Sequence, residues 1–197
     1  MRVPGMLQAV AGPEAQRILQ QMPSAARGLL RAMTVLGETD STQEELRRLP
    51  AAERHGHAVL AQTQRAGQGR RGRRWHSPAS DNVYLSLGWR LERPAGELAG
   101  LPLVAAIAAA RAVRGLGLAR LAIKWPNDLV LAPGADQPLR KLGGCLVELQ
   151  PEGSRACVAL VGIGLNVRFH QPPGEAIDQP WTDLASHLPG RLPEVSR

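Results

Sequence analysis

The sequence predicts an α+β fold, in which a mixed or antiparallel β-sheet carries helices packed on one side. Short apolar runs with strand periodicity outnumber the helical segments, and most of them follow one another with no helix between. One alanine-rich segment, Leu98–Leu116, has the composition of a long helix, and Gly115 and Gly117 are suited to end it. A doubly wound parallel sheet would need strands and helices in regular alternation, which this chain lacks.

Length and composition favour one globular domain. The chain has 197 residues, of which 44% are hydrophobic and 21% charged, so wholesale disorder is excluded. No apolar run approaches the roughly 18 residues that cross a bilayer, and the first residues lack the apolar core of a secretion signal. We therefore expect a cytoplasmic protein with no membrane partner, and we expect Cys145 and Cys157 to be reduced core thiols.

The first part of the chain is expected to be helical. Residues 1–33 have helix potential from Pro13, interrupted at Pro23, and are too short and too weakly patterned for a winged helix-turn-helix. A strand is predicted at Thr34–Glu38. The next helix is expected to begin at Ser41, because Ser41 and Glu44 have the spacing of a capping box.

The remainder is predicted as strands around the long helix. The expected strands are His57–Gln62, Val83–Leu91, Leu121–Lys124, Leu129–Leu131, Lys141–Leu149 and Val158–Val167. Gly153 and Ser154 should separate the last two as a hairpin, and the Pro-rich tail has one helical segment, Trp181–Leu188.

The charge suits an anionic partner, and its composition singles out two residues. Lys and Arg number 24 against 17 Asp and Glu, a net charge of +7. Lys124 and Lys141 are the two lysines among these 24, and an arginine cannot replace a lysine where a compact point charge is needed. Lys141 opens a buried strand beside Gly143 and Gly144, a poor position for a solubilising charge, so we predict that it is the cation of a site.

The segment Gly67–Trp75 carries the next functional signal. Its glycines match G-x-G-x-x-G, but the residues after it lack the helical period that a dinucleotide-binding turn requires. What remains is a glycine loop with four arginines and Trp75, suited to hold a phosphate and to stack on a purine. A solvated basic loop or a nucleic-acid contact is the alternative.

Two further segments are weaker signals. Asn127 and Asp128 follow Pro126 at a bend between two strands, where a carboxylate and an amide oxygen could ligate hydrated Mg²⁺; an ordinary Asx turn is the alternative. Period-2 alternation puts Gly162, Gly164 and Asn166 on one face of a strand, as a floor for a flat ligand; the alternative is a bulged strand.

Taken in order and spacing, these segments resemble the catalytic domain of the biotin protein ligases, the biotin–[acetyl-CoA-carboxylase] ligases. The matching segments are Glu38–Thr42, Gln64–Trp75, Lys124–Asp128, Lys141–Leu149 and Gly162–Asn166. The resemblance implies a fold related to class II aminoacyl-tRNA synthetases, with the catalytic domain at residues 34–190. It also implies that residues 1–33 are no complete DNA-binding domain, and that the family's C-terminal β-domain is absent.

The resemblance further implies a two-step reaction. Biotin would attack the α-phosphate of MgATP, giving biotinyl-5′-AMP, and a lysine of the biotin carboxyl carrier protein of acetyl-CoA carboxylase would then take the biotin. Biotin, ATP and Mg²⁺ would enter as substrates, with no tightly bound cofactor. DNA is not expected as a partner, and a homodimer is left open. The alternatives are a lipoate or octanoate ligase or transferase of the same fold, and a basic nucleic-acid-binding module.

The site residues follow from the resemblance position by position. Lys141 and Arg70 are implied to be catalytic. Those implied to contact biotin are Ser41, Thr42, Gln43, Gln64, Gln68, Gly69, Arg70, Lys141 and Gly144. Those implied to contact the nucleotide are Gly67, Gly69, Arg70, Arg73, Trp75, Asn127, Lys141 and Asn166, and Asp128 is the implied Mg²⁺ ligand. Many members of the family have arginine at the position of Gln68 and asparagine at that of Gln43.

Overall fold

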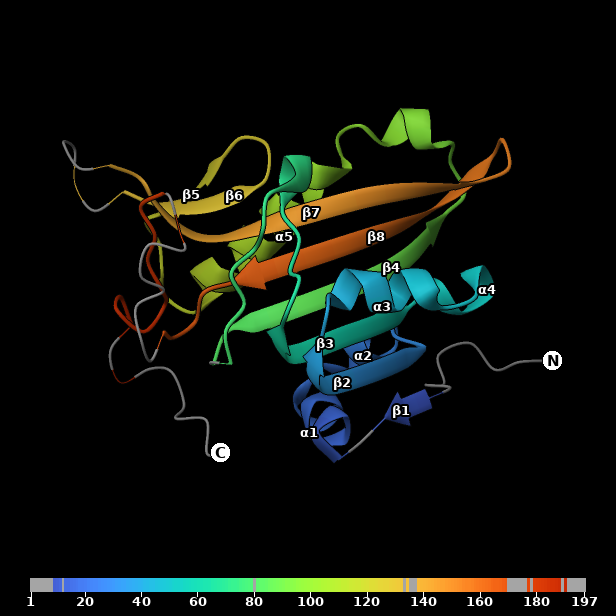
Figure 1. Cartoon of the computed structure of the whole chain (residues 1–197), viewed down its shortest axis with the longest axis horizontal. Coiled ribbons are helices and arrows are strands. Elements are labelled where there is room, and N and C mark those ends of the chain that lie inside the picture. The colour runs from blue at the N-terminus through green and yellow to red at the C-terminus, as the bar shows by residue number, and fades with distance from the viewer. Residues whose placement is uncertain are drawn as a thin grey trace.

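The computed structural model describes residues 9–11, 13–79, 81–132, 134, 138–169, 177, 179–188 and 190, which are organised around one eight-stranded sheet. The strand order is β1-β2-β3-β4-β8-β7-β6-β5 (Figure 1). The strands are β1 (Ala9–Ala11), β2 (Ala32–Thr39), β3 (His57–Gln64), β4 (Val83–Leu91), β5 (Leu121–Lys124), β6 (Asp128–Leu131), β7 (Arg140–Glu152) and β8 (Ala156–Leu165). The helices are α1 (Pro13–Gln21), α2 (Ser24–Arg27), α3 (Thr42–Arg48), α4 (Ala51–Arg54) and α5 (Leu101–Gly115), with 3₁₀ turns η1 (Arg70–Gly72) and η2 (Ala95–Leu98).

The sheet is mixed, as the sequence predicts. β1, β2 and β3 run parallel to one another, and every other neighbouring pair is antiparallel. Parallel neighbours need a crossover, and helices provide it here: α1 and α2 lie between β1 and β2, and α3 and α4 between β2 and β3. The antiparallel strands β7 and β8 are joined by the predicted hairpin, where Gly153 has a φ of 67°.

Helices cover both faces of the sheet. α1 and α5 share one face, because Leu85, which packs with α1, is paired in register with Ile163, which packs with α5. α3 lies on the opposite face, where Leu46 packs against Val59 and Leu160 (Figure 1). The expected packing on one side therefore describes α1 and α5 and has to be corrected for α3. The physical reason is that the central strands are apolar on both faces.

Helix α3 is short, so it leaves part of the sheet face on which it packs uncovered. The candidate functional site lies on this uncovered part. The face of β8 that meets α3 at Val158 and Leu160 continues with Gly162 and Gly164. These glycines carry no side chains, so the sheet surface is lower in front of the N-terminus of the helix. Gly162 and Gly164 thus lie on one face, next to the beginning of α3, as alternation predicts, but the surface that was expected to take a flat ligand is covered by the chain itself: Gln43 lies on Gly162 and Trp75 lies on Gly164.

Most predicted elements form within about three residues of their predicted bounds, but β1 was not predicted and lies in the segment expected to be helical. Three further differences concern the helices and the tail. α5 begins at Leu101, because the preceding residues form the separate turn η2. Ser41 is the N-cap of α3 but makes no side-chain cap bond, and Glu44 pairs with Arg47 instead, so the predicted capping box is not formed. Trp181 lies beside Lys141 as a β-bridge, and only the end of the predicted tail helix, from residue 184 to 188, forms a turn.

None of the helices in the described ranges combines the length and the apolar composition that a membrane crossing needs. Cys145 and Cys157 are both buried and unpaired, as expected of core thiols.

Candidate functional site

One cavity of about 350 Å³ brings the predicted site residues together. Those that line it are Ser41, Thr42, Gln43, Gln64, Gln68, Gly69, Arg70, Arg73, Trp75, Asn127, Asp128, Lys141, Gly144 and Asn166. Gly67 is the exception: it packs behind the cavity wall, where an added Cβ would lie 2.7 Å from the hydroxyl of Ser77 and from the carbonyl of Trp75. Residues from five separate stretches of the chain therefore converge on one space.

A β-bulge turns Lys141 toward this cavity. Asp128, Leu129 and Val130 of β6 face Gly144, Gly143 and Lys141 of β7 respectively, so Leu142 is the extra residue. Strict alternation from Gly144 would place Lys141 on the α5 face. The bulge instead keeps Leu142 on that face, fully buried against the α5 core, and re-aims Lys141 at the cavity.

The ammonium group of Lys141 is held in place on several sides. Its Nζ lies 2.9 Å from the carboxylate of Asp128, and the two side chains are 15% and 19% exposed. The same Nζ lies 5.3 Å from the ring centroid of Trp75, within reach of a cation–π contact. The backbone is anchored as well, since the Lys141 N–H donates to Pro180 and its carbonyl accepts from Thr182. Lys141 is thus a largely buried cation whose position is fixed by Asp128, Trp75 and the tail.

The segment Gly67–Trp75, called the arginine loop from here on, forms a short hairpin over the cavity. The N–H of Gly69 donates to the carbonyl of Arg73 at 2.7 Å, and the N–H of Trp75 donates to Gly67 at 2.8 Å. At the tip, Arg71 and Gly72 have φ values of 58° and 73°, the left-handed region that glycine adopts readily.

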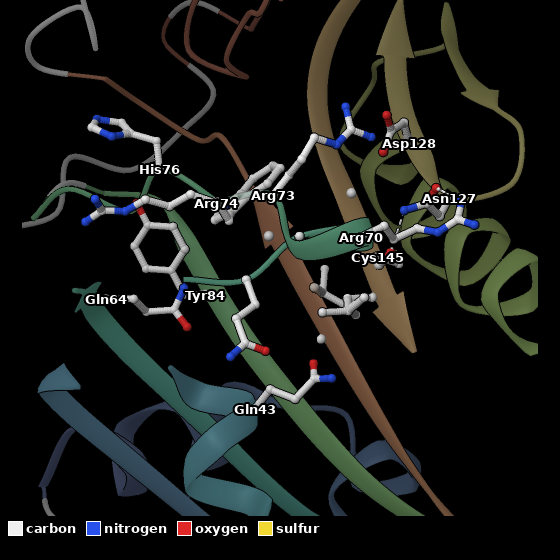
Figure 2. Close-up of a pocket in the computed structure, with 18 of the residues that line it drawn as sticks. Gln43, Gln64, Arg70, Arg73, Arg74, His76, Tyr84, Asn127, Asp128 and Cys145 are labelled. Atoms are coloured by element: carbon white, nitrogen blue, oxygen red, sulfur yellow. Dashed lines mark hydrogen bonds between the residues drawn. The ribbon is translucent and has the colours of Figure 1, made fainter. Parts of the chain in front are cut away.

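The hairpin delivers cations and an indole ring to the cavity. Arg70 reaches across to the side-chain oxygen of Asn127, 3.1 Å away (Figure 2). Trp75 lies directly on Gly164, where an added Cβ would be 2.5 Å from the indole ring. The lining contains the cations of Arg70, Arg73, Arg74 and Lys141 and, among its described residues, the single carboxylate of Asp128, so the cavity favours an anion.

Both the nitrogen and the oxygen of the Asn127 side-chain amide bond protein groups. Its amide nitrogen donates to the carbonyl of Cys145 at 2.7 Å, and its amide oxygen accepts from Arg70. This engagement disfavours Asn127 as the metal ligand that the sequence suggested. Asp128 keeps that option, because Mg²⁺ commonly takes one protein carboxylate plus substrate phosphate oxygens. The described residues contain no group of three or more His, Cys, Asp and Glu side chains able to hold a metal ion.

The opposite end of the cavity is closed and polar. Thr42 donates to the amide oxygen of Gln64 through its N–H at 2.9 Å and its hydroxyl at 3.2 Å, and the hydroxyl also lies 2.8 Å from that of Ser86. Gln43 is 3% exposed, and its amide nitrogen has no hydrogen-bond partner. Figure 2 shows Gln43 and Gln64 apart from Asn127 and Asp128, with Arg70 and Arg73 extending toward Asn127 and Asp128 and Arg74 lying near His76 and Tyr84. A ligand that fills the cavity would meet neutral hydrogen-bonding groups at one end and cations at the other.

Asn166 joins the floor strand to the tail. Its side-chain amide donates to the carbonyl of Thr182 at 3.0 Å and lies 3.4 Å from that of Lys141. The N–H of Leu184 donates in turn to the Asn166 carbonyl. Asn166 therefore lines the cavity, and it also supports the segment that carries Trp181.

Several lining residues were missed by the sequence reasoning. These are Arg74, His76, Tyr84, Leu85, Ser86, Cys145, Leu146, Ile163, Ile177, Gln179 and Trp181. Ser86 could have been predicted once β4 was paired with β8, since it lies opposite Gly162 in the sheet and so shares its face. Trp181 was not, because only the folded tail brings it beside Lys141.

Two titratable side chains on the cavity wall favour their neutral forms. Burial, together with the carboxylate of Asp128, raises the pKa of the Cys145 thiol to about 11, so this cysteine is not a thiolate at neutral pH. Burial, with the positive charge of Arg74 adding to it, lowers the pKa of His76. Neither group adds charge to the cavity near neutral pH.

Comparison with known proteins gives one family. The model of the biotin/lipoate A/B protein ligase family matches residues 35–166. The bifunctional ligase/repressor BirA of Salmonella typhimurium is 39% identical over 171 residues, covering 87% of this chain and 50% of the relative. The biotin–[acetyl-CoA-carboxylase] ligase of Paracoccus denitrificans is 38% identical, covering 68% of this chain and 53% of the relative. The chain thus spans about half the length of these relatives.

Solved structures give the same result. The biotin protein ligase of Leishmania major in complex with biotinyl-5-AMP superposes with a TM-score of 0.62 and 28% identity, covering 79% of this chain and 64% of that one. A mutant of the Aquifex aeolicus biotin protein ligase, in complex with biotin, gives a TM-score of 0.61 and 30% identity, over 79% and 60% of the two chains.

Proposed function

Because the chain belongs to the biotin/lipoate A/B protein ligase family, we propose that it ligates biotin to a lysine of a biotin carboxyl carrier protein, using ATP and passing through biotinyl-5′-AMP. Relatives that are named biotin ligases, and similar structures that hold biotin or biotinyl-5-AMP, support biotin and ATP as the substrates of the first step. The cations and the neutral polar groups at opposite ends of one cavity fit a ligand with a ring at one end and a phosphate at the other.

The closed polar end is the observation that favours biotin over lipoate or octanoate. Gln64 and Ser86 present amide and hydroxyl groups there, and the unpartnered amide nitrogen of Gln43 is a donor that needs an acceptor. The cyclic urea of biotin offers both N–H donors and a carbonyl acceptor. A lipoyl ring or an octanoyl chain offers no acceptor at this end of the cavity and would leave the Gln43 amide nitrogen without a partner, which costs affinity.

In the first step, a carboxylate oxygen of biotin forms a bond to the α-phosphorus of ATP, and the bond from that phosphorus to pyrophosphate breaks. Both reactants are anions, so cations must offset the charge that gathers on the phosphoryl oxygens. Lys141 and Arg70 are the proposed groups, because both line the cavity at its cationic end. In the second step, the neutral amine of the carrier lysine bonds to the acyl carbon, AMP leaves with the electron pair of the broken C–O bond, and the amine releases one proton to solvent.

The remaining roles follow from position. Trp75, lying against the glycine floor, is the proposed stacking surface for adenine, with Arg73, Asn127 and Asn166 around the nucleotide. Mg²⁺ arriving with ATP would neutralise phosphate charge, and Asp128 is the residue that would hold it. The homodimer, the cytoplasmic location and the domain limits at residues 1–33 and 34–190 stay predictions.

The decisive experiment is a calorimetric titration of the folded chain with biotin and, separately, with lipoate. We expect saturable heat with biotin and none with lipoate, followed by formation of radiolabelled biotinyl-5′-AMP when ATP carrying a labelled α-phosphate is added. Saturable binding of lipoate alone would instead assign the chain to the lipoate branch of the family. Heat from neither acid, in a sample that circular dichroism shows to be folded, would overturn the proposal.

A further inference from the structure

A buried serine behind the cavity connects its two ends. Ser77 is 5% exposed and is not among the described residues that line the cavity. Its hydroxyl accepts from the side-chain amide of Gln64 at 2.9 Å and donates to the carbonyl of Trp75 at 3.2 Å. Gln64 belongs to the polar end of the cavity, and Trp75 belongs to the cationic end. One hydroxyl therefore contacts both.

The hydrogen bonds along this path have a defined direction. The N–H of Thr42 can only donate, so the group of Gln64 that faces it must be the amide oxygen. The amide nitrogen then faces Ser77. Thr42 gives its one hydroxyl proton to the same oxygen, so Ser86 is the donor in its bond with Thr42.

The result is a chain of donors that runs from the polar end of the cavity to the arginine loop. Ser86 donates to Thr42, Thr42 to Gln64, Gln64 to Ser77, and Ser77 to the carbonyl of Trp75. Hydrogen bonds that follow one direction polarise and strengthen one another. The orientation of each member, and with it the pattern of donors and acceptors offered to a ligand, therefore depends on the next.

Packing makes the Ser77 position sensitive. An added Cβ on Gly67 would lie 2.7 Å from the Ser77 hydroxyl and 3.1 Å from the amide nitrogen of Gln64, so the start of the arginine loop closes directly over this junction. The N–H of Trp75 donates to the carbonyl of Gly67, which fixes the two ends of the loop to each other. A shift of the Ser77 hydroxyl would thus change the contacts of both Gln64 and the arginine loop.

We propose that Ser77 is a positioning residue that fixes the amide orientation of Gln64 and the backbone of Trp75, and so couples the acid end of the cavity to the loop that covers the nucleotide end. The ligand-binding part of this inference rests on the proposed function. The orientation of Gln64 does not, because it is a property of the ligand-free protein.

The first test uses the ligand-free protein. The side-chain amide of Gln64 gives two NMR signals, identified by their loss in Gln64→Glu. Ser77→Ala should shift and broaden them. Thr63→Val is the matched control, since it removes the 2.7 Å hydrogen bond from Thr63 to the backbone carbonyl of Ser77 and leaves the Ser77 hydroxyl in place. In Thr63→Val the Gln64 signals should stay where they are.

The second test measures binding. Ser77→Ala should raise the Kd for biotin about tenfold, the usual effect of losing one network hydrogen bond, and should increase the release of biotinyl-5′-AMP in the absence of carrier. Ser77→Thr, which keeps the hydroxyl, should restore both values, and Ser77→Cys, which keeps the volume but is a weak hydrogen-bonding group, should resemble alanine.

The two tests separate the inference from the proposed function. If the wild-type chain bound no biotin, the proposed function would fail, while the NMR comparison would still test the orientation of Gln64. If Ser77→Ala and Thr63→Val gave the same Gln64 signals and the same Kd, Ser77 would be an ordinary packing residue and the inference would be wrong.

Discussion

At the scale of single residues, the orientation of Lys141 matters more than its presence. Its rarity in an arginine-rich chain singled it out, but alternation along its strand would have put it on the wrong face of the sheet. The bulge at Leu142 corrects this, and the Gly143-Gly144 pair was the available signal, since glycines within a strand often mark bulges. The sequence thus identified Lys141 as the candidate cation, whereas the side of the sheet that its side chain faces depended on a β-bulge.

Replacing each lysine in turn should show whether the rate of adenylate formation depends on a positive charge in the cavity or on positive charge in general. Lys141→Ala should lower the rate of biotinyl-5′-AMP formation by about 10²–10³-fold, because it removes an oriented cation from the reacting phosphate. Lys124→Ala is the matched control: it removes the other lysine, which is exposed, and should leave the rate unchanged. Single-turnover assays with ATP labelled at the α-phosphate would measure both.

Loss of stability has to be distinguished from loss of chemistry in this comparison. Lys141→Ala leaves the carboxylate of Asp128, 19% exposed, without its partner, so some decrease in Tm is expected. Lys141→Met, which keeps the length of the side chain, should remain folded and equally slow. A wild-type rate in either variant would remove Lys141 from the catalytic groups.

At the scale of elements, strands were more predictable than the segments around them. β4 and β5 have the predicted bounds, because their apolar runs end at clear turn residues. The tail was predicted as a helix from Trp181, yet residues 180–182 run beside Lys141, with backbone hydrogen bonds to it. A segment whose hydrogen-bond partners lie about forty residues away carries little local pattern, so sequence alone could not place it.

The glycine floor gives a prediction at this scale. Gly164→Ala would place a methyl group against the indole of Trp75, so the ring must move and the nucleotide end of the cavity narrows. We expect the unfolding free energy to fall by about 1–2 kcal/mol, as in other overpacked sites, and the affinity for ATP to fall more than that for biotin.

Gly37→Ala is the matched control for the floor. Gly37 also lies within a strand, and an added Cβ there would meet no atom within 4 Å. Its urea unfolding curve and its ATP titration should match those of the wild type. Equal effects of the two substitutions would mean that strand propensity, rather than contact with Trp75, explains the loss at Gly164.

At the scale of the whole molecule, the fold class was predictable and the sheet order was not. The mixed sheet follows from the number of strand patterns and the small number of helices between them. β2 and β3 pair in parallel, and β1 adds a further parallel strand at the edge, but β1 has three residues and is too short to show any periodicity. Likewise, the placement of α3 on its own face follows from central strands that are apolar on both sides, a pattern compatible with several arrangements.

Stability of the whole molecule should depend on histidines in a known direction. Burial lowers the pKa of His55, His57 and His76, with nearby arginines adding to the effect at His55 and His76. In the unfolded chain these groups titrate near pH 6.5. Between their folded and unfolded pKa values the unfolded chain binds more protons, so acid favours unfolding. The contribution is complete above about pH 7 and is lost as the pH falls through the lowered values.

The corresponding measurement is urea unfolding at about pH 7.5 and pH 5.5, a window chosen to lie above the ordinary pKa of carboxylates. The unfolding free energy should be smaller at the lower pH. His57→Gln should reduce that difference, because His57 is 9% exposed and its ring nitrogen shares a 2.9 Å hydrogen bond with Thr34, a site where added charge is poorly solvated. His57 lies on β3 and outside the cavity lining, so the affinity of His57→Gln for biotin at pH 7.5 should match that of the wild type. Equal unfolding free energies of the wild type at the two pH values would contradict the prediction that these histidines destabilise the fold in acid.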